Sequence, residues 1–215
     1  MFGIIDVVQT LVPLQAQSAI TPYDPLIVSL VILAIGGALG ALFLVREVRG
    51  THGPDDRGSF AWLFGLLGFI SLLLSGELFW ANWAGFPAQQ YTELFGVAQT
   101  MFAVVMLAAA FVIYTDLDPK PFTWLTGISG LVQLQGANAI FAFGLTKSPI
   151  VATGIWLTAG LAEIGLLPAA YADPDSDART YLVYLVAALL IVMAVLSLIT
   201  AVGGHYSHIA EAASK

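Results

Sequence analysis

Hydrophobic residues run along the chain in six long stretches that short polar segments separate. Each stretch is about 20 residues or longer, which suffices for a helix to cross about 30 Å of hydrocarbon. The pattern predicts an all-α integral membrane bundle of six transmembrane helices, at about 25–45, 59–80, 92–114, 122–143, 150–171 and 180–202. The last span is predicted to end at Gly203-Gly204. Because the loops are short, residues 1–215 are expected to form a single transmembrane domain.

The segment before the first span, Met1 to Gln17, is apolar and carries one charge, at Asp6. A cleaved signal peptide would begin with a positively charged region. We therefore expect a short N-terminal helix that lies in the membrane interface.

Composition agrees with a membrane protein, since 59% of the 215 residues are apolar and 10% are charged. A soluble domain carries about 25% charged residues, so a soluble enzyme is excluded and the lipid bilayer is the first expected partner. The net charge of −7 and the lack of a basic patch exclude a nucleic-acid partner. The chain has no cysteine, which excludes thiolate metal sites, iron–sulfur clusters and covalent haem, and we expect no cofactor.

Charged residues in the loops predict the orientation. Five basic residues fall on one side of the predicted bundle and two on the other; they are Arg46, Arg49, Arg57, Lys120 and Arg179 against Lys147 and Lys215. The positive-inside rule then places both termini outside a multi-pass plasma-membrane protein. The Asp-rich, Lys-poor loops are typical of salt-adapted archaeal proteins, whose acidic surfaces stay soluble when salt screens charge.

Glu163 is the clearest polar residue within a span. A carboxylate at the centre of a membrane helix costs about 2.5–3.5 kcal/mol on insertion scales, so it needs a partner, a proton or water. Gly160 and Ala159 precede it by one helical turn, so this side of the helix is small and is expected to face a neighbour. The residue is either a proton- or ion-coupled site or one end of an interhelical hydrogen bond.

Polar residues also follow the span over 122–143. Thr126, Ser129 and Gln133 share one face, and Gln135 and Asn138 define a second. Both faces are expected to point inward, because lipid tolerates few amides. They form either a hydrogen-bonding solute path or polar contacts between helices, and Gln99 in the preceding span would join either arrangement.

Two carboxylates and two histidines are expected near the outer interface. Glu77 closes the second span and Glu93 opens the third. His205 and His208 have a spacing that would allow metal chelation on a helix, although two ligands need others to complete a site. The alternative is an ordinary polar tail.

Gly36 and Gly40 form a GxxxG step in the first span. Small residues allow two helix backbones to approach closely. The step indicates internal packing or, alternatively, a homodimer face.

Residues 92–171 contain short phrases that carry a resemblance. Phe95-Gly96 opens a span, Asp118-Pro119 occupies a loop, and Gly-Leu-Thr-Lys-Ser-Pro over 144–149 precedes the next span. These phrases resemble an uncharacterised family of archaeal and actinobacterial polytopic membrane proteins, a domain of unknown function. The resemblance implies a multi-pass fold and carries no activity or functional residues. In size and span count the chain is also similar to six-span urea and amide channels, a likeness of build that says little about function.

Three functions remain after these exclusions, and no catalytic motif points to an enzyme. The leading hypothesis is a small-solute or ion channel or transporter. The residues expected to line its path or outer mouth are Glu163, Gln133, Gln99, Asn138, Glu77 and Glu93. The alternative is a non-catalytic membrane subunit or scaffold of a larger complex, and the third is a metal or redox site at His205 and His208. Homo-oligomers or partner membrane subunits are compatible with the first two.

Overall fold

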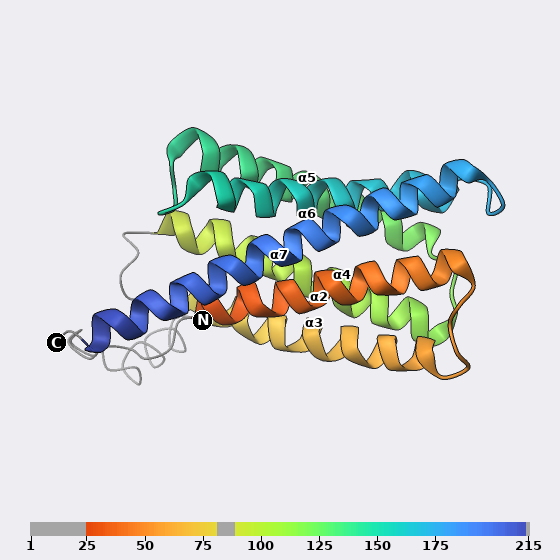
Figure 1. Cartoon of the computed structure of the whole chain (residues 1–215), viewed down its shortest axis with the longest axis horizontal. Coiled ribbons are helices and arrows are strands. Elements are labelled where there is room, and N and C mark those ends of the chain that lie inside the picture. The colour runs from red at the N-terminus through yellow and green to blue at the C-terminus, as the bar shows by residue number, and fades with distance from the viewer. Residues whose placement is uncertain (1–24, 81–88, 214–215) are drawn as a thin grey trace, which may run out of the picture.

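The computed structural model describes residues 25–80 and 89–213 (Figure 1). Within them the chain forms six α-helices: α2 (Pro25–Arg49), α3 (Asp56–Trp80), α4 (Gln89–Thr115), α5 (Lys120–Phe143), α6 (Pro149–Tyr171) and α7 (Asp177–Ala213). The all-α fold is confirmed by these elements. The predicted N-terminal interfacial helix lies outside the described residues.

Proline and glycine explain several helix ends. Pro149 is the first residue of α6 and Pro121 lies in the first turn of α5, positions where the missing N–H is not needed. Gly144 ends α5 in a left-handed conformation with φ 62°, and its N–H donates to the Ile140 carbonyl oxygen. Gly50, with φ 60°, follows the last residue of α2. These residues confine the connections to short polar turns.

The helices lie side by side as an antiparallel bundle (Figure 1). Helix α3 packs along α4, while α5, α6, α7 and α2 pack in sequence against one another. The two groups meet at α4–α5 and α2–α3, where the backbones approach at far fewer points. The bundle is therefore a tight α3–α4 hairpin set loosely against a tight four-helix layer.

The outer surface of the bundle is strongly apolar. Trp62, Phe143 and Ile150 are each exposed by 75% or more, while several serines, threonines and glutamines lie among the apolar residues of the interior. A soluble protein rarely exposes so many large apolar side chains, because large apolar patches favour association in water. Five helices, α2, α3, α4, α6 and α7, are long and apolar enough to cross a membrane. This is a multi-pass membrane protein.

Two details differ from the sequence prediction. Helix α7 continues through Gly203 and Gly204 to Ala213, so the predicted helix end at these glycines is wrong. A glycine within a helix costs about 1 kcal/mol relative to alanine, which helix-compatible residues on either side outweigh. Helix α5, predicted as the fourth span, has the length of a span but is more polar than the other five.

The glycines of the GxxxG step pack inside the chain. A Cβ atom added to Gly36 would lie 2.6 Å from the Phe102 ring on α4, and one added to Gly40 would lie 3.3 Å from Leu190 on α7. Of the two interpretations left open by the sequence, these contacts favour internal packing.

Most of the basic residues lie at one end of the bundle. Arg46, Arg49, Arg57, Lys120 and Arg179 all lie at the end that holds the α2–α3, α4–α5 and α6–α7 connections (Figure 1). We call this the arginine end. Lys147 lies in the α5–α6 connection, at the opposite end of the bundle. Helix α7 also ends at that opposite end (Figure 1).

Candidate functional site: a cavity inside the bundle

A cavity of about 620 Å³ lies inside the bundle, on the loosely packed side of α4. Its lining extends along α2 from Leu26 to Glu47, and from Phe95 on α4 to Asp116, which directly follows that helix. At about 1.5 Å per helical residue, each of these stretches is about 31 Å long. The cavity therefore follows nearly the whole length of the bundle, a distance close to the thickness of a bilayer core.

Glu163 on α6 lines this cavity and is 8% exposed. Its carboxyl lies beside the Ser129 hydroxyl of α5, but Oε2 of Glu163 and Oγ of Ser129 lack a partner with hydrogen-bond geometry among the described atoms. The ion pairs among the described side chains all lie at the arginine end, and none of them includes Glu163. The carboxyl group thus faces the cavity without a protein cation.

Two glutamines line the same cavity from other helices. Gln133 on α5 is 6% exposed and Gln99 on α4 is 8% exposed. The Nε2 atom of Gln99 has no hydrogen-bond partner within the described part of the chain. An amide that is buried without a partner is costly in a closed protein interior, whereas water or a solute in the cavity would satisfy it.

Close packing of α5 on α6 sets the position of Glu163. A Cβ atom added to Gly130 would lie 2.6 Å from the carbonyl oxygen of Gly160, and one added to Gly160 would lie 2.8 Å from that of Gly130. Gly130 precedes Gln133 by three residues, and Gly160 precedes Glu163 by three. The glycine contact therefore draws the two polar side chains into one part of the bundle.

Aromatic residues line the cavity nearer the opposite end. The rings of Phe95 on α4 and Trp156 on α6 meet edge to face, with centroids 6.0 Å apart and an interplanar angle of 70°. Trp156 also covers Gly136 on α5, where a Cβ atom would collide with the indole ring. These contacts bring α4 close to α6 through side chains, although the two backbones stay apart.

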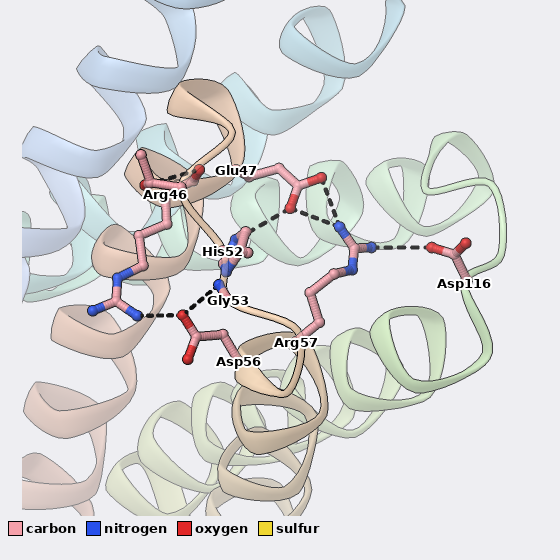
Figure 2. A network of polar contacts seen from close by, with 8 residues as sticks. Arg46, Glu47, His52, Gly53, Asp56, Arg57 and Asp116 are labelled. Carbon is pink, nitrogen blue, oxygen red and sulfur yellow. Dashed lines mark hydrogen bonds and ion pairs between the residues drawn. The ribbon is translucent and has the colours of Figure 1, made fainter.

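A network of ion pairs forms the rim of the cavity at the arginine end (Figure 2). The Arg57 guanidinium donates to both carboxylate oxygens of Glu47, at 2.8 and 2.7 Å, and to Asp116 at 3.2 Å. Nε2 of His52 lies 3.2 Å from Glu47. Arg57 thereby links α3 to the end of α2 and to the residue that follows α4.

Sequence reasoning missed this rim. Arg57 was used only to predict orientation, and Glu47 and Asp116 fall in polar connections where solvated charges are usual. Asp116 follows Arg57 by 59 residues in the sequence, whereas Glu47 precedes Arg57 by only ten. The spacing of Glu47 and Arg57 across one loop was the available signal.

The other predicted residues lie outside the cavity lining. Asn138 is exposed on the outer face of α5, Glu93 is exposed near the start of α4, and Glu77 is half-buried near the end of α3. His205 and His208 are exposed on the last turns of α7. Within residues 25–80 and 89–213, no group of three or more His, Asp or Glu side chains is placed to hold a metal ion.

Comparisons with known proteins give one match. A family model described as "Protein of unknown function (DUF981)" matches residues 22–211. Searches of the curated proteins and of the solved structures return no match.

Proposed function

We propose that this chain, which belongs to the DUF981 family of proteins of unknown function, moves a small solute or ion across the membrane. The observation that carries the proposal is the cavity of about 620 Å³ that follows the bundle for about 31 Å. Its volume is in the range of small-molecule sites, about 300–1,000 Å³. A channel or transporter needs internal space along much of its length, and a closed helical bundle has no need of it.

The polar residues of the cavity support the same proposal. Glu163, Gln133 and Gln99 come from three helices and line one cavity, and two of them have buried polar atoms without a described partner. Polar side chains inside a membrane bundle are expensive unless they pair or face water. A solute path would satisfy the buried atoms of Gln99 and Glu163 that lack a partner among the described residues, and Glu163 also lies beside Ser129 of the neighbouring helix.

Helix α5 completes the proposed transmembrane domain as its sixth span. Its 24 residues are about 36 Å long and run beside α6. Its lower hydropathy follows from the polar face that contains Thr126, Ser129 and Gln133 and that is turned into the bundle. With six spans and the arginine end in the cytoplasm, both termini would lie outside the cell.

A second candidate function is a subunit or scaffold of a larger membrane complex. The observation that favours it is the exposed face of α5, where Gln135 and Asn138 lie beside Leu131 on the outside of the chain. Amides facing lipid leave hydrogen-bonding groups unsatisfied, and a neighbouring chain would satisfy them. Native mass spectrometry of protein extracted gently from its own membrane tests this candidate, since co-purifying chains at fixed stoichiometry are expected only for a complex.

The transport proposal is tested with purified protein in proteoliposomes. Flux of protons, monovalent cations, ammonia, urea and acetate is measured against protein-free vesicles. We expect at least one solute to cross faster with the protein, and we expect Gln133→Leu to slow that flux by about tenfold, which equals about 1.4 kcal/mol on the barrier.

Gln135→Leu is the matched control for this experiment. It makes the same chemical change on the same helix, but residue 135 is exposed on the outer face of α5 whereas residue 133 lines the cavity. If Gln133→Leu and Gln135→Leu lost flux equally, the loss would be due to impaired folding or membrane insertion and not to the cavity. Vesicles that remain impermeable to all five solutes with wild-type protein would overturn the proposal.

A further inference from the structure

The cavity has an excess of acidic groups that the fold does not balance. Deep within it the one charged side chain is Glu163; the remaining charged residues of the lining lie at the arginine end and are Glu47, Arg57, Asp116, Asp118 and Arg179. The lining thus holds four carboxyl groups and two guanidinium groups. Arg57 is already bound to Glu47 and Asp116, so it does not offset the charge of Glu163.

Glu163 is suited to bind a ligand inside the cavity. It is more than nine-tenths buried, its Oε2 atom has no hydrogen-bond partner among the described atoms, and it lines the cavity. The Oγ atom of the neighbouring Ser129 has no partner with hydrogen-bond geometry among the described atoms either. A buried carboxylate is strongly destabilised unless a positive charge compensates it or it binds a proton. A cation in the cavity would supply that positive charge.

The wall beside Glu163 indicates the shape of that cation. Trp156, Ala159 and Glu163 all line the cavity and follow one another on α6 at intervals of three and four residues, so they share a face. Trp156 and Glu163 are about 10.5 Å apart along the helix axis, and between them stands only the small side chain of Ala159. A carboxyl group at one end and an indole ring at the other suit a ligand with a positive head and an apolar body.

The rest of the lining fits the apolar body. Most of the side chains around the cavity are aliphatic or aromatic, and Phe95 and Phe102 extend the aromatic wall from α4. Apolar surfaces of this kind bind hydrocarbon groups of a ligand, and aromatic faces also attract a cation directly. An inorganic cation would instead need a shell of oxygen ligands. Away from the arginine end, the polar side chains of the lining come from four different helices and are Glu163, Gln133, Gln99 and Ser29.

We infer that the cavity binds a monovalent organic cation with an apolar body, such as an alkyl- or arylalkylammonium, with its charged head at Glu163 and its body toward Trp156. This inference rests on the proposed transport function and names the class of solute for that same cavity. It requires no covalent or redox step.

Binding of benzyltrimethylammonium, a permanent monocation, is the test. Isothermal titration calorimetry of the detergent-solubilised full chain measures its affinity, alongside the neutral isostere neopentylbenzene and the anion phenylacetate. We expect the cation to bind, the anion not to bind, and the neutral compound to bind at least tenfold more weakly than the cation. Equal affinity for the cation and its neutral isostere, or no binding of the cation, would overturn the inference on the wild-type protein alone.

Glu163→Gln locates the interaction, since it keeps the shape of the side chain and removes its charge. We expect it to weaken binding of the cation at least tenfold and to leave binding of the neutral isostere unchanged. The matched control is Glu93→Gln, which removes a carboxylate that is exposed and outside the cavity; its affinity for the cation should equal that of the wild type. Undiminished binding by a folded Glu163→Gln variant would contradict the inference.

The two proposals fail in different ways. Flux of neutral solutes without binding of the cation would overturn the inference and leave the transport function standing. Binding of the cation that depends on Glu163, in a protein whose vesicles are impermeable to every solute including benzyltrimethylammonium, would support the binding site and overturn transport.

Discussion

Gly130 and Gly160 face each other across the α5–α6 contact, and a Cβ atom on either would lie within 2.8 Å of the other's carbonyl oxygen. The contact is between backbones, so a side-chain rotation cannot relieve it. It stands one turn from both Gln133 and Glu163. Helices α5 and α6 can lie this close only because Gly130 and Gly160 have no Cβ atom. The geometry of the cavity wall depends on this close approach.

Gly160→Ala is therefore expected to destabilise the protein. Overpacking of this kind typically costs about 1–3 kcal/mol, and the midpoint of thermal unfolding in detergent measures the loss. Gly203→Ala is the control, because Gly203 lies in the continuous helix α7 and nothing stands within 4 Å of its added Cβ atom. The control should be neutral or slightly stabilising, since alanine favours the helix by up to about 1 kcal/mol. An equal stability of wild type and Gly160→Ala would show that α5 and α6 separate without cost.

Gln99→Leu distinguishes a solute path from polar contacts between helices. The Nε2 atom of Gln99 is buried without a described partner, so replacing the amide by an apolar group of similar size removes an unsatisfied donor. We expect the unfolding midpoint in detergent to stay the same or rise. If Gln99 held two helices together through a hydrogen bond, the variant would instead lose about 0.6 kcal/mol, the average for such contacts in a membrane protein.

Arg57→Gln is expected to loosen the arginine end more than it lowers overall stability. Partly exposed ion pairs contribute about 0–1 kcal/mol, and Arg57 and Glu47 are both more than one-third exposed. However, the ion pairs that join the ends of α2 and α4 in the described part of the chain run through Arg57, so hydrogen exchange should become faster around residues 46–57 and 112–118. High salt should reduce the difference from wild type by screening the pairs. Lys147→Gln, which removes one positive charge at the opposite end, should leave exchange at the arginine end unchanged.

Trp156→Ala tests the aromatic contact between α4 and α6. The indole ring meets Phe95 edge to face and fills the space above Gly136, so its removal is expected to widen the cavity at this level. Under the transport proposal, flux of the small neutral solutes urea and ammonia through proteoliposomes should increase, and selectivity between them should fall. A flux of these two solutes that decreases in a variant with unchanged secondary structure would contradict this expectation. Trp62→Ala is the control, because Trp62 is 76% exposed on the outer surface.

Hydropathy alone predicts the class of protein and the approximate positions of its helices. A membrane span is recognised from the length and hydropathy of one continuous segment. The six apolar stretches and their polar connections can therefore be identified without knowing how the helices contact one another. The cost of polar groups in a membrane depends on residue type and depth, and it predicts a path at Glu163, Gln133, Gln99, Asn138, Glu77 and Glu93. The first three of these residues line the cavity. Among the described helices the largest difference from the predicted bounds is at α7, which continues through Gly203 and Gly204.

The tertiary structure decided which polar face of α5 is inside. Gln133 and Gln135 differ by about 200° around the helix, and the sequence offered no reason to expose one of them. Packing of Gly130 on Gly160 and of Gly136 under Trp156 turns Gln133 to the cavity and leaves Gln135 and Asn138 outside. The rim of Glu47, Arg57 and Asp116 and the loose seam beside α4 likewise depend on contacts between distant segments. Such contacts are set by the shapes of several helices together, which no single stretch of sequence contains.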